Sequence, residues 1–472
     1  MYSTMRSNSS LSKVQHFSMT FRQLHQCCKI LVVGGGTAGC AMAAKLSQKF
    51  DKTPNHVIVI EPSEVHYYQP LFTLIGGGIK DLESSRKSMK SVLPQKAQWI
   101  KDKVVCFQPS ENQVKTSNGD TIQYEYMIVA MGMDLYWDKL PGLQEALKDP
   151  KSQVCSIYGA HTVSKVFDKI KNVKSGNALF TFPNTPVKCP GAPQKIVYLA
   201  EEFWSKNGKR KDVCIVYNTS LPVIFGVKKY ADALWDVCKR RSINVNLRSN
   251  LIEIRPDRKE AVFEDLDNSD KKTTYEYSLL HVTPPMGTPV ALKQNCELTN
   301  ASGFLEVNPK TLQHIRYNNI YGLGDCTTTP NSKTMAAIAS QSKVLYNNLM
   351  QRIAGEEMTW SYNGYASCPL VTGPGKCILA EFDYNLTPTE TFPFDQGKEL
   401  YSMYLLKKDV FPFIYWNLMV KYVHKIKEKK FLYTKLIINH YGYRGNWNGP
   451  EAYRKLFSLL NSKDNVNSIM NK

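Results

Sequence analysis

The chain has 472 residues, of which 43% are hydrophobic and 21% are charged. This ordinary globular composition excludes a largely disordered or fibrous protein. With 60 Lys and Arg against 41 Asp and Glu, the formal net charge is +19. No apolar run reaches ~18 residues, so we expect no transmembrane helix. The excess positive charge points to nucleic acid, an anionic membrane surface or acidic substrates as partners.

The positive charge is concentrated at the two ends of the chain. Residues 1–50 contain six Lys and Arg and no acidic residue, and residues 397–472 contain 14 Lys and Arg against five acidic residues. A nucleic-acid groove is normally built on the folded core, and here the middle of the chain is close to neutral, so we expect no nucleic-acid partner. Residues 1–28 are Ser-rich and basic and lack an apolar signal core. They predict a mitochondrial transit peptide, with a disordered tail as the alternative.

A dinucleotide-binding fingerprint comes next. Residues 29–33 predict a buried strand, residues 40–50 a helix and residues 56–60 a second strand. Glu61 lies 22 residues after the last glycine of a G-x-G-x-x-G turn, where an acid binds the adenosine ribose hydroxyls. We predict that cofactor phosphates meet the helix N-terminus at this turn. The predicted contact residues are Gly34, Gly36, Thr37, Ala38 and Gly39.

Two later segments favour FAD as the dinucleotide. Residues 124–133 predict a strand ending at Ala130 and Gly132, which resembles a segment of flavoproteins with two dinucleotide-binding domains. Residues 318–326 predict a strand ending in Gly324-Asp325, and in those flavoproteins this Asp binds the ribityl chain of FAD. A helix is predicted over 333–353. Its N-terminus and Lys333 are expected to face the flavin, with a solvated lysine as the alternative.

The second nucleotide site is predicted to be degenerate. Strands are predicted at 177–182, 212–217 and 243–247. The first strand should lead into a Gly-rich turn, but residues 183–195 contain four prolines and one glycine. Proline lacks the N–H group that cradles a phosphate, so we expect no NAD(P)H site. In its place stands Cys189 beside Lys188, a cationic neighbour that favours the thiolate.

Twelve cysteines are too dilute for a disulfide scaffold, and none has zinc-site spacing, so we expect no metal. Cys368 precedes a proline, as Cys189 does. We predict that these two cysteines meet at the flavin and exchange electrons through a disulfide, with Cys377 as an alternative partner. The other cysteines are expected to be structural.

Four segments, 184–204, 367–373, 378–384 and 390–399, resemble the eukaryotic mitochondrial sulfide:quinone oxidoreductase family. The resemblance extends over residues 28–416 and resumes near residues 445–457. It implies that sulfide attacks a Cys189–Cys368 disulfide at Cys368, which keeps a persulfide while Cys189 leaves as a thiolate. It also implies sulfur transfer to glutathione or sulfite, and electron transfer through FAD to ubiquinone at the matrix side of the inner mitochondrial membrane.

The expected fold is α/β, with two Rossmann-like domains of the FAD/NAD(P)-binding type and a C-terminal membrane-interacting region. Residues 391–422 combine aromatic residues with lysines, which is typical of an amphipathic segment in the membrane interface, although a basic helix capping the core is the alternative. The predicted domains are a transit peptide (1–28), the FAD domain in two parts (29–154 and 286–355), a second Rossmann-like domain (155–285) and a quinone- and membrane-interacting region (356–472). The predicted quinone-pocket residues are Phe382, Phe394, Phe411 and Tyr415.

Residues 421–444 interrupt the resemblance. They carry seven Lys and Arg and one acidic residue, and they are either a genuine insertion or a retained intron, which the transcript sequence distinguishes.

Two rival functions remain. A type II NADH:quinone oxidoreductase shares FAD and membrane contact but needs the missing second cradle. A non-catalytic flavin-binding redox sensor would not need either cysteine for turnover.

Overall fold

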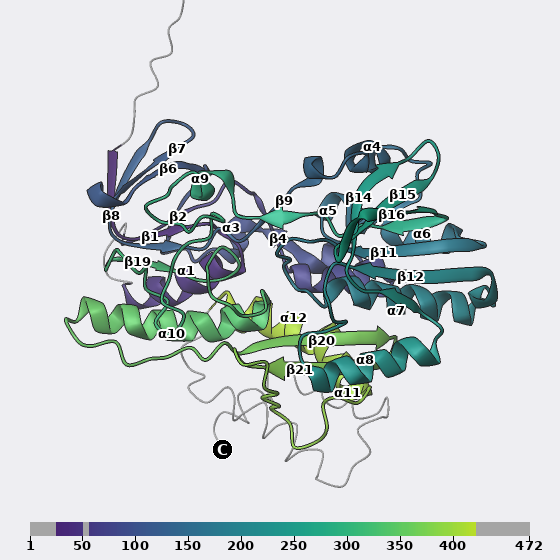
Figure 1. Cartoon of the computed structure of the whole chain (residues 1–472). Coiled ribbons are helices and arrows are strands. Elements are labelled where there is room, and N and C mark those ends of the chain that lie inside the picture. The colour runs from purple at the N-terminus through teal and green to yellow at the C-terminus, as the bar shows by residue number, and fades with distance from the viewer. Residues whose placement is uncertain (1–24, 51–55, 422–472) are drawn as a thin grey trace, which may run out of the picture.

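The computed structural model describes residues 25–50 and 56–421 (Figure 1). The predicted transit peptide up to residue 24 and the interrupting segment from residue 422 lie outside the described residues. The first strand, β1 (His25–Val33), pairs with a later strand from His25 onward, so the folded strand begins four residues before the predicted domain start at residue 29.

The first sheet has seven strands in the order β5-β2-β1-β8-β7-β6, with β19 also paired to β8. Strands β5, β2, β1, β8 and β19 are parallel, and β6 and β7 form an antiparallel edge. Apolar side chains of β1 and β2 are buried on both faces, as expected in the middle of a parallel sheet. The bounds are β2 (Val57–Ile60), β5 (Gln98–Ile100), β6 (Val104–Gln108), β7 (Gln113–Thr116), β8 (Thr121–Val129) and β19 (Ile320–Gly322).

The second sheet has five parallel strands in the order β10-β17-β11-β12-β13. Helix α7 (Ala192–Lys206) connects β11 to β12, and α8 (Lys228–Arg240) connects β12 to β13. This sheet and the first one lie on opposite sides of Figure 1, joined where β9 pairs with β18. The bounds are β9 (Asp134–Leu135), β10 (Val154–Cys155), β11 (Gly176–Phe182), β12 (Val213–Thr219), β13 (Asn244–Asn246), β17 (Leu279–His281) and β18 (Met286–Gly287).

Two Rossmann-type sheets with connecting helices confirm the predicted α/β class. Helices α1 (Thr37–Lys49) and α10 (Met335–Ile353) lie along the first sheet. Helix α10 starts two residues later than predicted, and the Thr334 side chain accepts the hydrogen bond that caps its N-terminus. The remaining elements are α2 (Phe72–Gly76), α3 (Met89–Val92), α4 (Leu143–Lys148), α5 (Ala160–Val163), α6 (Val166–Asn172), α9 (Val290–Lys293), β3 (Val65–Tyr67), β4 (Arg86–Ser88), β14 (Ser249–Arg255), β15 (Glu260–Asp265) and β16 (Asn268–Glu276).

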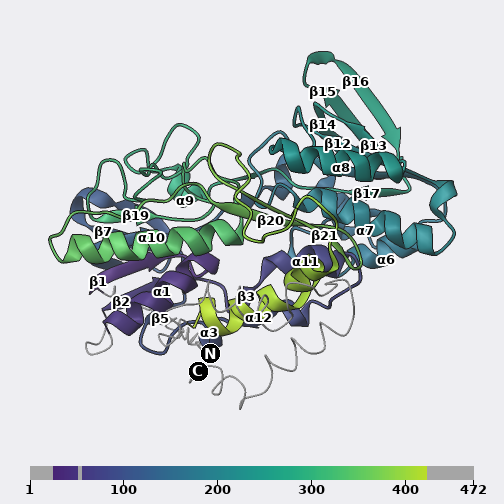
Figure 2. The same cartoon turned by 90° about the horizontal axis from the view of Figure 1, so that it is seen from below.

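The last part of the described chain spans both halves. An antiparallel hairpin, β20 (Ala366–Gly373) and β21 (Lys376–Phe382), packs against α7 and α10. A continuous helical stretch then runs from Tyr401 to Met419, which we call the C-terminal segment. It consists of α11 (Tyr401–Leu405), a π-helical turn at Leu406–Val410, α12 (Phe411–Ile414) and a second π-helical turn at Tyr415–Met419. Figure 2 shows this segment lying beside β3. Among the described residues, none of the helices has the length and apolar character to cross a bilayer.

Candidate active site

The glycine-rich turn between β1 and α1 has the geometry of a phosphate cradle. A Cβ atom on Gly39 would lie 1.7 Å from the carbonyl oxygen of Gly34, so only glycine permits this close turn. No side chain caps the start of α1, and its first turn contains no acidic residue. The free N–H groups and the helix dipole at this end therefore suit an anionic phosphate.

The other predicted FAD segments converge on the same turn. Ala130 donates its backbone N–H to Val33 at 2.8 Å, and Leu323, just before Gly324, donates to Val129 at 3.3 Å. Glu61 follows β2, and its carboxylate accepts the N–H of Gly35 at 2.6 Å. The acid predicted for the ribose thus also orders the phosphate turn. The residues present fit a dinucleotide at this edge of the sheet, and the individual contacts of Gly36, Ala38 and Gly132 stay predictions.

Asp325 and Lys333 lie together next to this cradle. Burial raises the pKa of Asp325, which is partly offset by the positive charges of Lys333 and Lys188. The ammonium of Lys333 donates to the carbonyl oxygens of Thr327 and Thr329, at 2.8 Å each. Lys333 is therefore tied to the loop that carries Asp325, which argues against the solvated alternative. Its predicted contact with the flavin remains a prediction.

Cys189 and Cys368 meet although 178 residues separate them in the sequence. Cys189 lies in the turn before α7, and Cys368 lies on β20, where its side chain is 1% exposed. The two thiols are in hydrogen-bond contact. The close approach depends on Gly191, because a Cβ atom there would lie 2.6 Å from the sulfur of Cys368. The pair occupies the end of α7 at which a second dinucleotide phosphate would bind in a Rossmann fold.

Two buried lysines place positive charge near the cysteine pair. The ammonium of Lys195, one turn into α7, lies 3.6 Å from the sulfur of Cys189. Lys407 comes from the C-terminal segment, is 3% exposed, and its ammonium donates to the carbonyl oxygen of Pro70 at 2.6 Å. Lys188, the cationic neighbour of Cys189 in the sequence, lies close enough to Asp325 and Asp134 for their charges to act on it, while burial lowers its pKa. Its predicted effect on the Cys189 thiolate stays a prediction.

These contacts shift the pKa values of the two cysteines in opposite directions. The hydrogen bond from Cys368, followed by the charges of Lys195 and Lys407, holds the pKa of Cys189 well below its usual value. The same hydrogen bond and burial raise the pKa of Cys368 well above the usual value. Burial lowers the pKa of Lys407 to about 8, whereas the two cysteines raise that of Lys195 despite its burial. The arrangement therefore favours a thiolate at Cys189 and a protonated thiol at Cys368.

Cys377 does not join this contact. It lies on β21 opposite Val371, is 0% exposed, and its thiol contacts the carbonyl oxygen of Ile378 at 3.6 Å. Burial raises its pKa to about 12. Within the part of the chain that the structure describes, no group of three or more His, Cys, Asp or Glu has a metal-binding arrangement.

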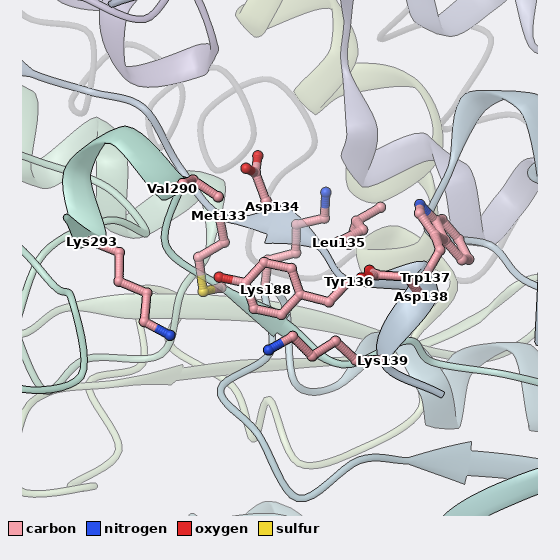
Figure 3. Close-up of a pocket in the computed structure, with 10 residues that line it drawn as sticks. All are labelled: Met133, Asp134, Leu135, Tyr136, Trp137, Asp138, Lys139, Lys188, Val290 and Lys293. Carbon is pink, nitrogen blue, oxygen red and sulfur yellow. The ribbon is translucent and has the colours of Figure 1, made fainter. Parts of the chain in front are cut away.

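A pocket of about 580 Å³ opens next to Lys188, between the strands that join the two halves (Figure 3). Lys139 and Lys293 extend toward each other from opposite sides of it. Tyr136 forms part of the wall, and its hydroxyl donates to the carbonyl oxygen of Thr288 at 2.7 Å. Three lysines and two aspartates line the pocket, together with apolar and aromatic residues: Met133, Asp134, Leu135, Tyr136, Trp137, Asp138, Lys139, Lys188, Val290 and Lys293.

Three of the four predicted quinone-pocket residues have ring partners, and these partners differ. Phe382 packs against Phe225, and Phe394 stacks on Phe392. Phe411 is half-buried on α12. Tyr415 is 0% exposed and packs against Tyr68, with ring centroids 4.5 Å apart. No ring contact joins any two of the four across the described residues, and their role stays a prediction.

Sequence reasoning missed three residues of this site: Lys195, Lys407 and His66. The sequence contained one signal for Lys195, because it lies only six residues after Cys189. It contained no signal for Lys407, which reaches the cysteines only through the path of the C-terminal segment. His66 contacts that segment, with its Nε2 atom hydrogen-bonded to the hydroxyl of Tyr415.

The fold and the cysteine pair next to a dinucleotide cradle define a class of flavin-dependent disulfide oxidoreductases. Residues 28–179 match the pyridine nucleotide-disulphide oxidoreductase family. A sulfide:quinone oxidoreductase structure from Aquifex aeolicus has the same fold, with a TM-score of 0.72 and 18% identity, covering 87% of this chain and 95% of that one.

More similar relatives define the family. The mitochondrial sulfide:quinone oxidoreductase of Mus musculus is 46% identical over 445 residues, which cover 93% of each chain. That of Dictyostelium discoideum is 44% identical over 401 residues, covering 85% of this chain and 87% of the relative. The chain belongs to the sulfide:quinone oxidoreductase family, and it is an FAD-dependent oxidoreductase.

Proposed function

We propose that this mitochondrial protein oxidises hydrogen sulfide and passes two electrons through FAD to ubiquinone. The observation that carries the proposal is the contact between Cys189 and Cys368, with Lys195 and Lys407 buried beside it. A thiol pair that cycles through a disulfide needs one cysteine that leaves easily as a thiolate. The surroundings of Cys189 lower its pKa and so provide that leaving group.

The proposed cycle starts from a Cys189–Cys368 disulfide. Hydrosulfide forms a bond to the sulfur of Cys368, and the bond between the two cysteines breaks. Cys368 then carries a persulfide, and Cys189 carries the negative charge as a thiolate next to Lys195. The attack at Cys368 is supported by the pKa asymmetry, because the cysteine with the lower pKa is the better leaving group.

The second half of the cycle removes the sulfur and the electrons. A thiolate such as glutathione, or sulfite, bonds to the outer sulfur of the persulfide and leaves Cys368 as a thiolate. The two cysteines then re-form their disulfide and release two electrons. FAD, when bound, accepts an electron pair and returns it to a quinone. Lys195 and Lys407 balance the negative charge that develops on the sulfurs during both halves.

Cysteine substitutions test this proposal against a flavin-binding redox sensor. In anaerobic sulfide titrations of the full chain, we expect Cys189→Ser and Cys368→Ser to lose sulfide-dependent quinone reduction by at least ~10²-fold, because each removes a covalent step. Cys377→Ser is the control and should stay within a few fold of the wild type. Full turnover in either of the first two variants would refute the relay.

The rival NADH:quinone oxidoreductase is tested in the same apparatus. The turn before α7 contains Cys189, which meets Cys368 of β20, instead of a glycine-rich cradle, and this supports sulfide as the reductant. We expect sulfide to bleach the flavin absorbance and NADH to leave it unchanged. Bleaching by NADH alone would reverse the choice between the two enzymes.

The pocket beside Lys188 supports an anionic sulfur acceptor. Lys139 and Lys293 provide two exposed cations at its mouth, and Lys188 is the chain neighbour of Cys189. We expect a Lys139→Gln/Lys293→Gln variant to raise the KM for sulfite and for glutathione at least ~5-fold, as loss of charge pairing predicts. The KM for sulfide and for quinone should not change. An unaltered acceptor KM would place the acceptor elsewhere.

The aromatic and basic C-terminal region supports a position on the inner mitochondrial membrane, facing the matrix. Ubiquinone is dissolved in the bilayer, so the enzyme must reach the lipid surface. Half-buried Phe411 and Phe413 lie on α12 of the C-terminal segment. We propose that α12 faces lipid and that Phe382, Phe394, Phe411 and Tyr415 contribute to the quinone route. Quinone KM values of the corresponding alanine variants test each residue separately.

A further inference from the structure

A hydrogen-bond chain links the C-terminal segment to the phosphate turn. The hydroxyl of Tyr415 lies 3.0 Å from the hydroxyl oxygen of Thr37, the first residue of α1. It is also hydrogen-bonded to Nε2 of His66. The other ring nitrogen of His66, Nδ1, lies 3.0 Å from the carbonyl oxygen of Gly35. This series of hydrogen bonds thus begins at Thr37 and ends at Gly35, and both residues belong to the phosphate turn.

The chemistry of the partners determines the direction of each bond. The Gly35 carbonyl only accepts, so Nδ1 of His66 must donate to it. Burial lowers the pKa of His66 to about 4, so the ring is neutral at pH 7 and Nε2 must accept. The Tyr415 hydroxyl therefore donates to His66, and its oxygen accepts from Thr37. Every polar atom of this buried chain has a partner, and removing one member leaves its neighbours unpaired.

The two peptide groups that flank Gly35 are both held. The Gly35 N–H donates to Glu61 at 2.6 Å, and the Gly35 carbonyl accepts from His66 and from the thiol of Cys40 at 3.1 Å. The orientation of these two peptide groups determines where the N–H groups of the turn point. Tyr415, through His66, therefore acts on the shape of the turn that we assign to the FAD phosphates.

The same segment also supplies the cation of the cysteine pair. Lys407 precedes Tyr415 by eight residues, and its buried ammonium acts on Cys189. One short helical stretch therefore contacts the phosphate turn through Tyr415 and acts on the thiolate through the charge of Lys407. A ligand that orders the turn favours docking of the segment, and docking of the segment favours the ligand by the same factor.

We propose that Tyr415 is a positioning residue for FAD, which fastens the C-terminal segment to the phosphate turn so that FAD binding and segment docking stabilise each other. The coupling requires FAD binding alone and does not depend on sulfide as the substrate. A Tyr415→Phe variant keeps the ring that packs against Tyr68 and Trp416 and removes only the hydroxyl.

The first measurement is the rate at which the purified holoprotein releases FAD, and flavin fluorescence monitors this release. We expect Tyr415→Phe to release FAD at least ~5-fold faster than the wild type. Tyr401→Phe is the matched control, because Tyr401 lies on the same segment, is half-buried and has no hydroxyl hydrogen bond among the described residues. Its release rate should match the wild type.

The second measurement is proteolysis within residues 401–420, with and without excess FAD. In the wild type, FAD should slow cleavage at least ~5-fold, and in Tyr415→Phe this protection should shrink to less than twofold. His66→Ala should behave like Tyr415→Phe, and the double variant should be no worse than either single variant, because the members act as one unit.

Two outcomes would overturn the proposal. An unchanged FAD release rate in Tyr415→Phe would show that the hydroxyl does not act on the cofactor. Equal loss of thermal stability in the holoprotein and apoprotein, with unchanged protection by FAD, would show that Tyr415 only packs. Neither readout depends on sulfide oxidation, so failure of the proposed catalytic cycle would leave this test intact.

Discussion

Cys189 has a φ of 54°, a left-handed conformation that residues other than glycine rarely adopt. Two backbone hydrogen bonds hold it there: its N–H donates to the carbonyl of Lys333 at 2.7 Å, and its carbonyl accepts from Ala192 at 2.8 Å. The first bond ties the cysteine to Lys333, two residues before α10, and the second ties it to the start of α7. The unfavourable conformation is thus over-determined by its surroundings, which is common at functional sites.

Gly191 provides a steric test of the cysteine contact. Its φ of −78° and ψ of −5° suit alanine, so a Gly191→Ala variant changes only the space beside Cys368. We expect sulfide-dependent flavin reduction to fall at least ~10-fold, because small displacements of reacting groups are costly. Gly226→Ala is the control, since a Cβ atom there meets nothing closer than 3.8 Å. Equal rates in both variants would contradict the close approach.

Lys195 provides an electrostatic test of the thiolate. Removing its charge disfavours the thiolate at Cys189, so a Lys195→Gln variant should raise the pKa of Cys189 by about one unit or more. The pH dependence of alkylation, followed at the Cys189 peptide by mass spectrometry, measures this pKa. The same substitution at Lys188, whose charge is offset by those of Asp325 and Asp134, should have a smaller effect. A larger effect at Lys188 would make Lys188 the main cation that stabilises the Cys189 thiolate.

At the scale of elements, the N-terminus of α7 faces the cysteine pair, and the C-terminal segment carries Lys407 and Tyr415. Helix α7 retains its place between β11 and β12, but its N-terminus faces a cysteine pair instead of a nucleotide phosphate. A helix of 15 residues presents positive potential at this end, which stabilises the Cys189 thiolate. The C-terminal segment has two π-helical turns, which include Lys407 and Tyr415. Such turns are frequent at functional sites.

Docking of the C-terminal segment on β3 should depend on pH. The pKa of His66 falls from its ordinary 6.5 to about 4 in the folded protein, so the unfolded chain binds a proton that the native chain excludes. The contribution is complete above pH 6.5 and is lost as the pH falls toward 4. Between pH 7 and pH 5 this costs roughly 2 kcal/mol of unfolding free energy.

Guanidinium unfolding of the wild type and of His66→Gln at pH 7 and pH 5 measures that contribution. The wild type should lose roughly 2 kcal/mol more than the variant, because glutamine does not titrate. The other buried histidines, His281 and His314, titrate in both proteins and cancel in the comparison. The nearest titratable groups, Cys40 and Tyr415, have raised pKa values and stay protonated in this range. Equal losses in both proteins would contradict the prediction.

At the scale of the whole molecule, most of the excess positive charge lies outside the region that forms the active site. Helix α7, the β20–β21 hairpin and the C-terminal segment supply the cysteine pair and its two buried lysines, whose charges act on the Cys189 thiolate. Much of the remaining excess charge lies in the predicted transit peptide and after residue 396. This distribution supports a membrane-facing C-terminal end.

Binding to anionic vesicles tests that distribution. Each lysine near an anionic surface contributes about 1 kcal/mol, so replacing Lys425, Lys427, Lys429 and Lys430 by glutamine should weaken vesicle binding at least ~10-fold. Raising the salt concentration should weaken binding of the wild type more than that of the variant. A sedimentation assay measures both effects. Unchanged binding would assign membrane contact to other residues, and a transcript lacking 421–444 would remove this segment altogether.

Local patterns in the sequence were sufficient for the α/β class, for the strands around the phosphate turn and for the two cysteines. Each of these depends on neighbours within one or two elements: glycines in a tight turn, apolar residues in a buried strand, or a proline after a cysteine. The tertiary structure alone decided that the charge of Lys407 acts on Cys189, and that Tyr415 reaches Thr37 and His66. These interactions join segments hundreds of residues apart, and burial sets the pKa values of the groups, so no local pattern encodes them.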